Sequence, residues 1–217
     1  MDASSFFSTQ ELQDIEAAVK RAESTTSGEI VPCIVARSDD YHAAAWKGAL
    51  LGALGAQLVA GMVHLLAGLW GMSVLWLTLP AFTGAAVGFA LTALVPGLRR
   101  LLTAPDEMDH HVRRRALEAF VEHEVFKTGE RTGVLLFLSL HERRVVVLGD
   151  TGINAKVRPQ EWDGIVAGVV AGIKAGTPGR AVVEAIGHCG ELLTRDGLAI
   201  RPDDTNELPD GMRIERE

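Results

Sequence analysis

Residues 48–98 read GALLGALGAQLVAGMVHLLAGLWGMSVLWLTLPAFTGAAVGFALTALVPGL, and this stretch contains no Asp, Glu, Lys or Arg. A helix needs about 20 predominantly apolar residues to cross the hydrocarbon core of a bilayer. The stretch is therefore long enough for two crossings joined by a tight turn. We expect a two-helix transmembrane hairpin at residues 43–100, with spans at about 46–66 and 73–95.

Charged residues beside the hairpin set its expected topology. Lys47 precedes the first span, Arg99 and Arg100 follow the second, and the turn at 67–72 carries no charge. Because cytoplasmic loops are enriched in Lys and Arg, we expect a two-pass protein of the plasma (inner) membrane with both termini in the cytoplasm. The two cysteines are expected to be free thiols, which agrees with that compartment.

The segments on either side of the hairpin have the patterns of a soluble α/β domain. Apolar runs predict strands at 29–37, 134–138 and 145–148. Helical periodicity predicts helices after Ser8, after Pro105, at 159–175 and from Pro178 onward. A helix separates the first two strands, which are therefore expected to be parallel, whereas the last two form an antiparallel hairpin. The predicted sheet is mixed.

These patterns divide the chain into four segments. Residues 1–42 and 101–200 are the two parts of one domain, and residues 43–100 are the hairpin that interrupts it. Residues 201–217 form an acidic C-terminal tail, whose segment 201–210 has too few apolar residues to build structure alone.

Composition and missing motifs exclude several functions. The net charge of −7 argues against a nucleic-acid-binding protein, which needs a basic surface to neutralise phosphates. The sequence has no P-loop, no G-x-G-x-x-G after a strand, no H-E-x-x-H, no C-x-x-C and no G-x-S-x-G. We therefore favour a protein that is not an enzyme, and leave the question open.

Carboxylates at the ends of predicted strands are the candidate metal ligands. Asp39 and Asp40 follow the first strand, and Asp150 follows the last. Calcium and magnesium bind several oxygen ligands, which these side chains and loop carbonyls could supply. The alternative is that Asp39, Asp40 and Asp150 are ordinary turn residues.

Two polar side chains fall within the first predicted span. Gln57 and His64 lie on one helical face, and they either line a proton or ion path or hydrogen-bond Thr78 or Thr83 of the second span.

Small residues four positions apart occur in both spans. Gly48 and Gly52, and Gly84 and Gly88, let helix backbones approach closely, either within the hairpin or in self-association of two chains.

The helix after Pro105 carries basic residues near the membrane exit. Arg113, Arg114 and Arg115 either contact anionic headgroups at the membrane surface or belong to a solvated helix face. His123, further along this helix, is expected to face the core rather than to bind metal.

The order of these elements, with the sequences at their junctions, resembles the TPM domain family, and more narrowly a bacterial integral-membrane branch of that family. The matching segments are TSGEIV (26–31), TGVLLF (132–137), RRV (143–145), GDTGI (149–153), INAKV (153–157), PDD (202–204) and NELP (206–209). The resemblance implies a three-layer α/β/α sandwich with a small mixed sheet, interrupted by the transmembrane hairpin. It also implies that acidic residues can bind calcium and that phosphatase activity occurs among relatives, although Gly149–Gly152 departs from the family's Gly-Tyr-Gly loop.

Two functions remain from these observations. The first is a non-enzymatic adaptor or stabilising factor for other membrane proteins, held in the lipid bilayer by the hairpin. The alternative is a metal-dependent (Ca²⁺ or Mg²⁺) acid-phosphatase-like hydrolase of phosphomonoesters that uses Asp39, Asp40 and Asp150.

Overall fold

The computed structural model describes residues 3–67, 74–200 and 206–215. Within these residues the chain forms two units, one comprising 1–39 with 109–217 and the other comprising 40–108. The first unit is an α/β domain whose sequence is interrupted by the second, which is helical.

The α/β unit contains a four-stranded sheet with the order β3-β2-β1-β4. Its strands are β1 (Glu29–Val35), β2 (Gly133–Ser139), β3 (Arg144–Gly149) and β4 (Arg213–Glu215). β1 pairs in parallel with both β2 and β4, whereas β2 and β3 are antiparallel. The predicted α/β fold with a mixed sheet is confirmed, and β4 is a strand that the sequence patterns did not indicate.

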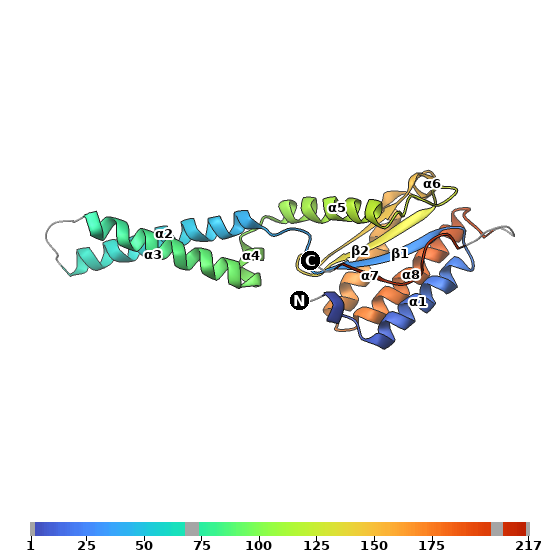
Figure 1. The fold of residues 1–217 in the computed structure, drawn as a ribbon, viewed down its shortest axis with the longest axis horizontal. Coiled ribbons are helices and arrows are strands. Elements are labelled where there is room, and N and C mark those ends of the chain that lie inside the picture. Colours follow the sequence, from blue (N-terminus) through green and yellow to red (C-terminus); the bar gives the residue numbers. More distant parts are fainter. Residues whose placement is uncertain (1–2, 68–73, 201–205, 216–217) are drawn as a thin grey trace. The chain divides into compact units, whose positions relative to one another are not determined.

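Helices cover both faces of this sheet (Figure 1). α5 (Pro105–Glu122), which begins in the helical unit, lies on one face. On the other face lie α1 (Thr9–Glu23), α7 (Asp163–Lys174) and α8 (Pro178–Arg195). The remaining helical elements of this unit are short: η1 (Ala3–Ser5), α6 (Thr151–Asn154) and η2 (Pro159–Trp162).

The side chains of β1 show why two layers of helices are needed. Alternate residues of a strand point to opposite faces, so Ile30 and Ile34 join the core beneath α1, α7 and α8, whereas Val31 and Cys33 join the core beneath α5. Every residue of β1 and β2 is buried. Pro32 lies within this central strand, just before the segment Cys33–Val35 that pairs with β4.

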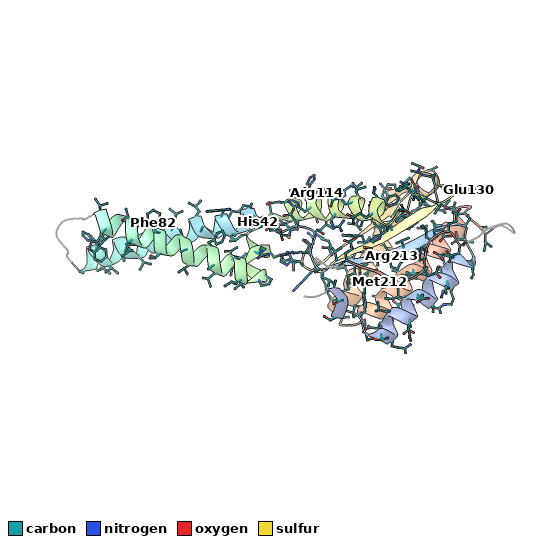
Figure 2. The ribbon with its side chains drawn as sticks, in the orientation of Figure 1. His42, Phe82, Arg114, Glu130, Met212 and Arg213 are labelled. Atoms are coloured by element: carbon teal, nitrogen blue, oxygen red, sulfur yellow. The ribbon has the colours of Figure 1, made fainter. Side chains whose placement is uncertain are left out.

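The helical unit contains α2 (His42–Leu66), α3 (Val74–Leu94) and α4 (Pro96–Leu101). α2 and α3 are long and apolar enough, by length and composition, to span a membrane. Their large apolar side chains are exposed, as shown by Leu58 (76 %) and Phe82 (73 %), of which Phe82 is labelled in Figure 2. Most of the predicted turn at 67–72 lies outside the described residues.

Glycines lie where the backbones of α2 and α3 meet. A Cβ atom built at Gly52 would lie 2.1 Å from the carbonyl oxygen of Gly84, and one at Gly88 would lie 2.2 Å from that of Gly48. No side chain larger than hydrogen fits at these positions without a shift of the backbone. The four small residues therefore contact one another within the hairpin, and self-association through them stays a prediction.

Candidate functional site

The carboxyl ends of β1 and β2 carry a buried polar network. Glu142, in the turn before β3, is fully buried, and its carboxylate accepts hydrogen bonds from the Ser38 N–H (2.9 Å) and from the Ser139 hydroxyl. The Ser38 and Ser139 hydroxyls lie 2.8 Å apart. The sequence patterns did not identify Glu142, because a charged residue in a turn is normally exposed. This network holds the segment that follows β1.

Asp39 extends this segment and lies beside α5. Its Oδ2 atom lies 3.0 Å from Nδ1 of His111 and accepts a hydrogen bond from Arg114 (3.1 Å). Asp40 belongs to the helical unit, where its carboxylate lies 3.5 Å from His42. Both predicted ligands are thus found beside basic groups of the chain.

Asp150 lies at the other end of the sheet. Its N–H donates to the carbonyl of Gly133, the first residue of β2, and its carboxylate caps α6 and pairs with Arg131 (2.7 Å). β3 runs antiparallel to β2, so the residue after β3 lies at the end where β1 and β2 begin. About 20 Å of strand, at roughly 3.3 Å per residue, separates this end from the one beside Asp39. The structure does not bring Asp39 and Asp150 to a common ion.

A second group of acids lies near the start of β1. Glu29 is only 6 % exposed, and its carboxylate accepts hydrogen bonds from the N–H groups of Glu207 (3.1 Å) and Leu208 (3.4 Å). Glu23, at the end of α1, accepts from the Ile30 N–H (2.8 Å). Burial raises the pKa of Glu23 to about 8 and also raises the pKa of Glu29. The Glu29 carboxylate attaches residues 207–208 to the domain, whereas Glu23 joins the end of α1 to β1.

Three potential metal ligands converge on the α5 side of β1. The Cys33 Sγ atom lies 3.7 Å from Nε2 of His123 and 3.7 Å from Oε1 of Glu215, and Nε2 of His123 lies 3.0 Å from that same oxygen. β4 positions Glu215, because Cys33 pairs with Arg213 (labelled in Figure 2) and Val35 pairs with Glu215. Cys33 is fully buried, whereas the side chains of His123 and Glu215 are 21 % and 14 % exposed.

This arrangement differs from a catalytic Cys–His pair. In a nucleophilic relay, one imidazole nitrogen faces the thiol and the other faces the orienting carboxylate. Here the thiol and the carboxylate both face Nε2 of His123. Burial also raises the pKa of the Cys33 thiol, which disfavours the thiolate that a nucleophile needs. The three donor atoms are arranged to bind a single ion rather than to pass a proton from one residue to the next.

The sequence patterns missed this cluster. His123 was expected to face the core, and Glu215 lies in the segment assigned to a tail. The sequence offered one weak signal, the alternation of apolar and charged residues in Met212–Glu215, which is too short to predict a strand.

Thr78 and Thr83, the expected partners of Gln57 and His64, donate hydrogen bonds within their own helix, and their pairing with Gln57 or His64 stays a prediction. Thr78 donates to the carbonyl of Val74 and Thr83 to that of Leu79, both within α3. Among the described residues, Oε1 of Gln57 and Nδ1 of His64 are buried atoms without a hydrogen-bond partner. The ring of His64 lies beside that of Trp76.

The predicted membrane-surface arginines differ from one another. Arg115 pairs with Glu215 of β4 and with Glu122 at the end of its own helix, α5. Arg114 is exposed and pairs with Asp39, and Arg113 is exposed. Arg114 and Arg115 thus have carboxylate partners within the α/β unit, and contact with headgroups stays a prediction.

The mixed sheet, with α5 on one face and α1, α7 and α8 on the other, defines an α/β domain with helices on both faces of the sheet. Among solved structures, the chain is similar to the BA42 protein of the psychrophilic bacterium Bizionia argentinensis, determined by NMR. The TM-score is 0.57 at 19 % sequence identity, and the match covers 96 % of this chain and 94 % of BA42. No family model and no curated protein matches the sequence. The similarity to BA42 establishes the fold.

Proposed function

We propose that this chain belongs to the bacterial integral-membrane branch of TPM-like proteins and serves as a non-enzymatic adaptor or stabilising factor for other membrane proteins. One observation carries the proposal: α2 and α3 expose apolar side chains along their lengths and are inserted between β1 and α5 of the domain. The domain is then attached to the bilayer at two points of its chain. Such an attachment suits a protein that binds partners in the same membrane.

The distribution of charge supports a cytoplasmic location for the domain. Lys47 lies in the second turn of α2 and Arg99 in α4, near the two ends of the apolar segment that join the domain, and Lys47 pairs with Glu107 (3.2 Å). Positive residues are retained on the cytoplasmic side of a membrane. The proposed protein crosses the inner membrane twice and has both termini in the cytoplasm.

Topology is testable with engineered thiols, because Cys33 and Cys189 are both buried and are poor reporters. Glu184 is exposed on α8, and Ala67 is exposed at the end of α2. An impermeant maleimide added to intact spheroplasts should label Ala67→Cys and spare Glu184→Cys, and lysis should make both reactive. Labelling of Glu184→Cys before lysis would overturn the proposed topology.

The adaptor role is tested by site-specific photo-cross-linking in native membranes. A photoreactive residue replaces Leu58, which is 76 % exposed, or, as the matched control on the same helix, Ala49, which is 7 % exposed. We expect Leu58 to cross-link to another membrane protein whose abundance falls when this chain is deleted and recovers when it is restored. Cross-links only to lipid, together with unchanged membrane-protein abundance in the deletion, would refute the role. A cross-linked second copy of the chain would indicate self-association instead.

A further inference from the structure

Cys33, His123 and Glu215 come from three separate elements and direct one ligand atom each toward a common point. Cys33 is in β1, His123 follows α5, and Glu215 is in β4. The three donor atoms lie within 4.8 Å of one another. Nothing in the adaptor role requires a thiol, an imidazole and a carboxylate at this place.

The spacing of the donor atoms matches a tetrahedral metal centre. Zinc binds sulfur at about 2.3 Å and imidazole nitrogen or carboxylate oxygen at about 2.0–2.2 Å, so tetrahedral ligands lie roughly 3.4–3.6 Å apart. The distances here are 3.7 Å from Sγ to Nε2, 3.7 Å from Sγ to Oε1, and 3.0 Å from Nε2 to Oε1. Shifts of a few tenths of an ångström would place all three donors around one ion.

We propose that Cys33, His123 and Glu215 form a zinc site with a fourth position open to solvent. A donor set of sulfur, nitrogen and oxygen selects a borderline-soft transition metal ion over calcium or magnesium, which require oxygen ligands. On binding, a Zn–S bond forms, the S–H bond of Cys33 breaks, and the proton passes to solvent. The thiolate and the carboxylate together neutralise the two positive charges of the ion.

Arg115 positions the carboxylate of this site. It pairs with Oε2 of Glu215, which leaves Oε1 directed at Cys33 and His123. Arg115 also pairs with Glu122 (3.1 Å), so its own charge is balanced outside the three ligands. Partners of this kind fix the orientation of metal ligands and raise their affinity.

Metal binding at this site would stabilise the attachment of β4 to the sheet. Among the described residues, β4 pairs with β1 at three positions, Cys33–Val35. An ion shared by Glu215, Cys33 and His123 joins β4 to the central strand and to the end of α5. Zinc then controls whether the last strand remains on the edge of the sheet.

Cobalt(II) substitution tests the thiolate ligand in the full-length chain, purified in detergent and stripped of metal. We expect one Co²⁺ per chain and a thiolate-to-cobalt charge-transfer band, which Zn²⁺ displaces. Cys33→Ser should abolish the band, whereas Cys189→Ser should retain it, because Cys189 is the other buried thiol and lies in α8. Absence of the band in the unmodified chain, or its persistence in Cys33→Ser, would overturn the proposal.

A second variant keeps the test decisive if Cys33→Ser does not fold. Glu215→Ala removes a ligand at the rim of the domain, and Glu122→Ala removes the neighbouring carboxylate, whose side chain is 56 % exposed. Zn²⁺ should raise the thermal unfolding midpoint of the unmodified chain and of Glu122→Ala but not of Glu215→Ala. The Arg115→Ala variant should bind zinc about tenfold more weakly than the unmodified chain. An equal zinc-induced shift in Glu215→Ala, or an equal shift with Ca²⁺ or Mg²⁺, would refute the site. The cross-linking result for the adaptor role is independent of each of these outcomes.

Discussion

The carboxylate oxygen Oε1 of Glu215 lies 3.0 Å from Nε2 of His123, although 92 positions separate the two residues. This contact exists because β4 adds to the edge of β1, and because α5, which ends directly before His123, lies on that face of the sheet. The end of the chain is thereby part of the sheet, and it carries a polar group into the neighbourhood of a buried thiol.

The half-buried acid Glu23 should make the domain less stable as the pH rises. Its pKa in the folded state is about 8, against an ordinary value of 4.5, so between these values the folded chain holds a proton that the unfolded chain has lost. Linkage then lowers the free energy of unfolding by up to about 1.4 kcal/mol per pH unit over this interval. Thermal unfolding of the unmodified chain and Glu23→Gln at pH 5 and pH 8 should show that the variant gains relative stability at pH 8.

Glu11 provides a control, because its pKa is shifted in the opposite direction to that of Glu23. Hydrogen bonds from Ser8 hold the pKa of Glu11 below its ordinary value. Its contribution to stability is therefore present above the unfolded pKa and is lost as the pH falls through the folded pKa. Glu11→Gln should lose stability at neutral pH and little at low pH. The same pH profile for Glu23→Gln and the unmodified chain would contradict the role of Glu23.

Replacing Glu142 should destabilise the α/β unit. Glu142→Ala removes the acceptor for the Ser38 N–H and the Ser139 hydroxyl in a fully buried site. Leaving buried donors without an acceptor costs about 1–3 kcal/mol. Urea unfolding followed by circular dichroism measures the difference. Glu118→Ala, at a side chain 51 % exposed, should change stability by less than about 0.5 kcal/mol, and equal effects of the two substitutions would count against the network.

Adding a methyl group where the glycines of α2 and α3 meet should destabilise the packing of the two helices. Gly52→Ala places a Cβ 2.1 Å from the Gly84 carbonyl oxygen, and such overpacking costs about 1–3 kcal/mol. Gly55 lies three residues further along α2, and a Cβ atom built there has no other atom within 4 Å. Gly55→Ala should therefore be neutral or stabilising, because alanine favours helix by about 1 kcal/mol over glycine. The measurement is thermal unfolding in mild detergent, and similar midpoints for the two variants would rule out the close approach.

Asp39 and Asp150 should act independently. Asp39→Ala removes the pairing with Arg114, and Asp150→Ala removes the cap of α6 and the pairing with Arg131. Distant residues without shared partners have additive effects within about 0.5 kcal/mol. A double-mutant cycle should give this result both with and without Ca²⁺ or Mg²⁺. If the effects of the two substitutions became non-additive only when the ion is added, Asp39 and Asp150 would share a metal site, as the sequence suggested.

Much of the fold could be predicted because its signals are local. The charge-free stretch 48–98 predicted α2 and α3, since the length and polarity of a helix are properties of consecutive residues. The helix predicted after Ser8 is α1, and the structure has a capping box between Ser8 and Glu11 at its start. The parallel pairing of β1 with β2 followed from the helix between them.

The candidate site could not be predicted in the same way. The sequence placed Asp150 at a strand end, but only the antiparallel direction of β3 decided that this end lies away from Asp39. Likewise, Cys33, His123 and Glu215 carry no shared spacing, because they meet through the pairing of β4 with β1 and the packing of α5. The sequence by itself determined the apolar helices and the elements of the α/β domain, through periodicities of neighbouring residues. Tertiary structure alone decided which functional groups meet, because contacts between distant residues depend on strand order and direction.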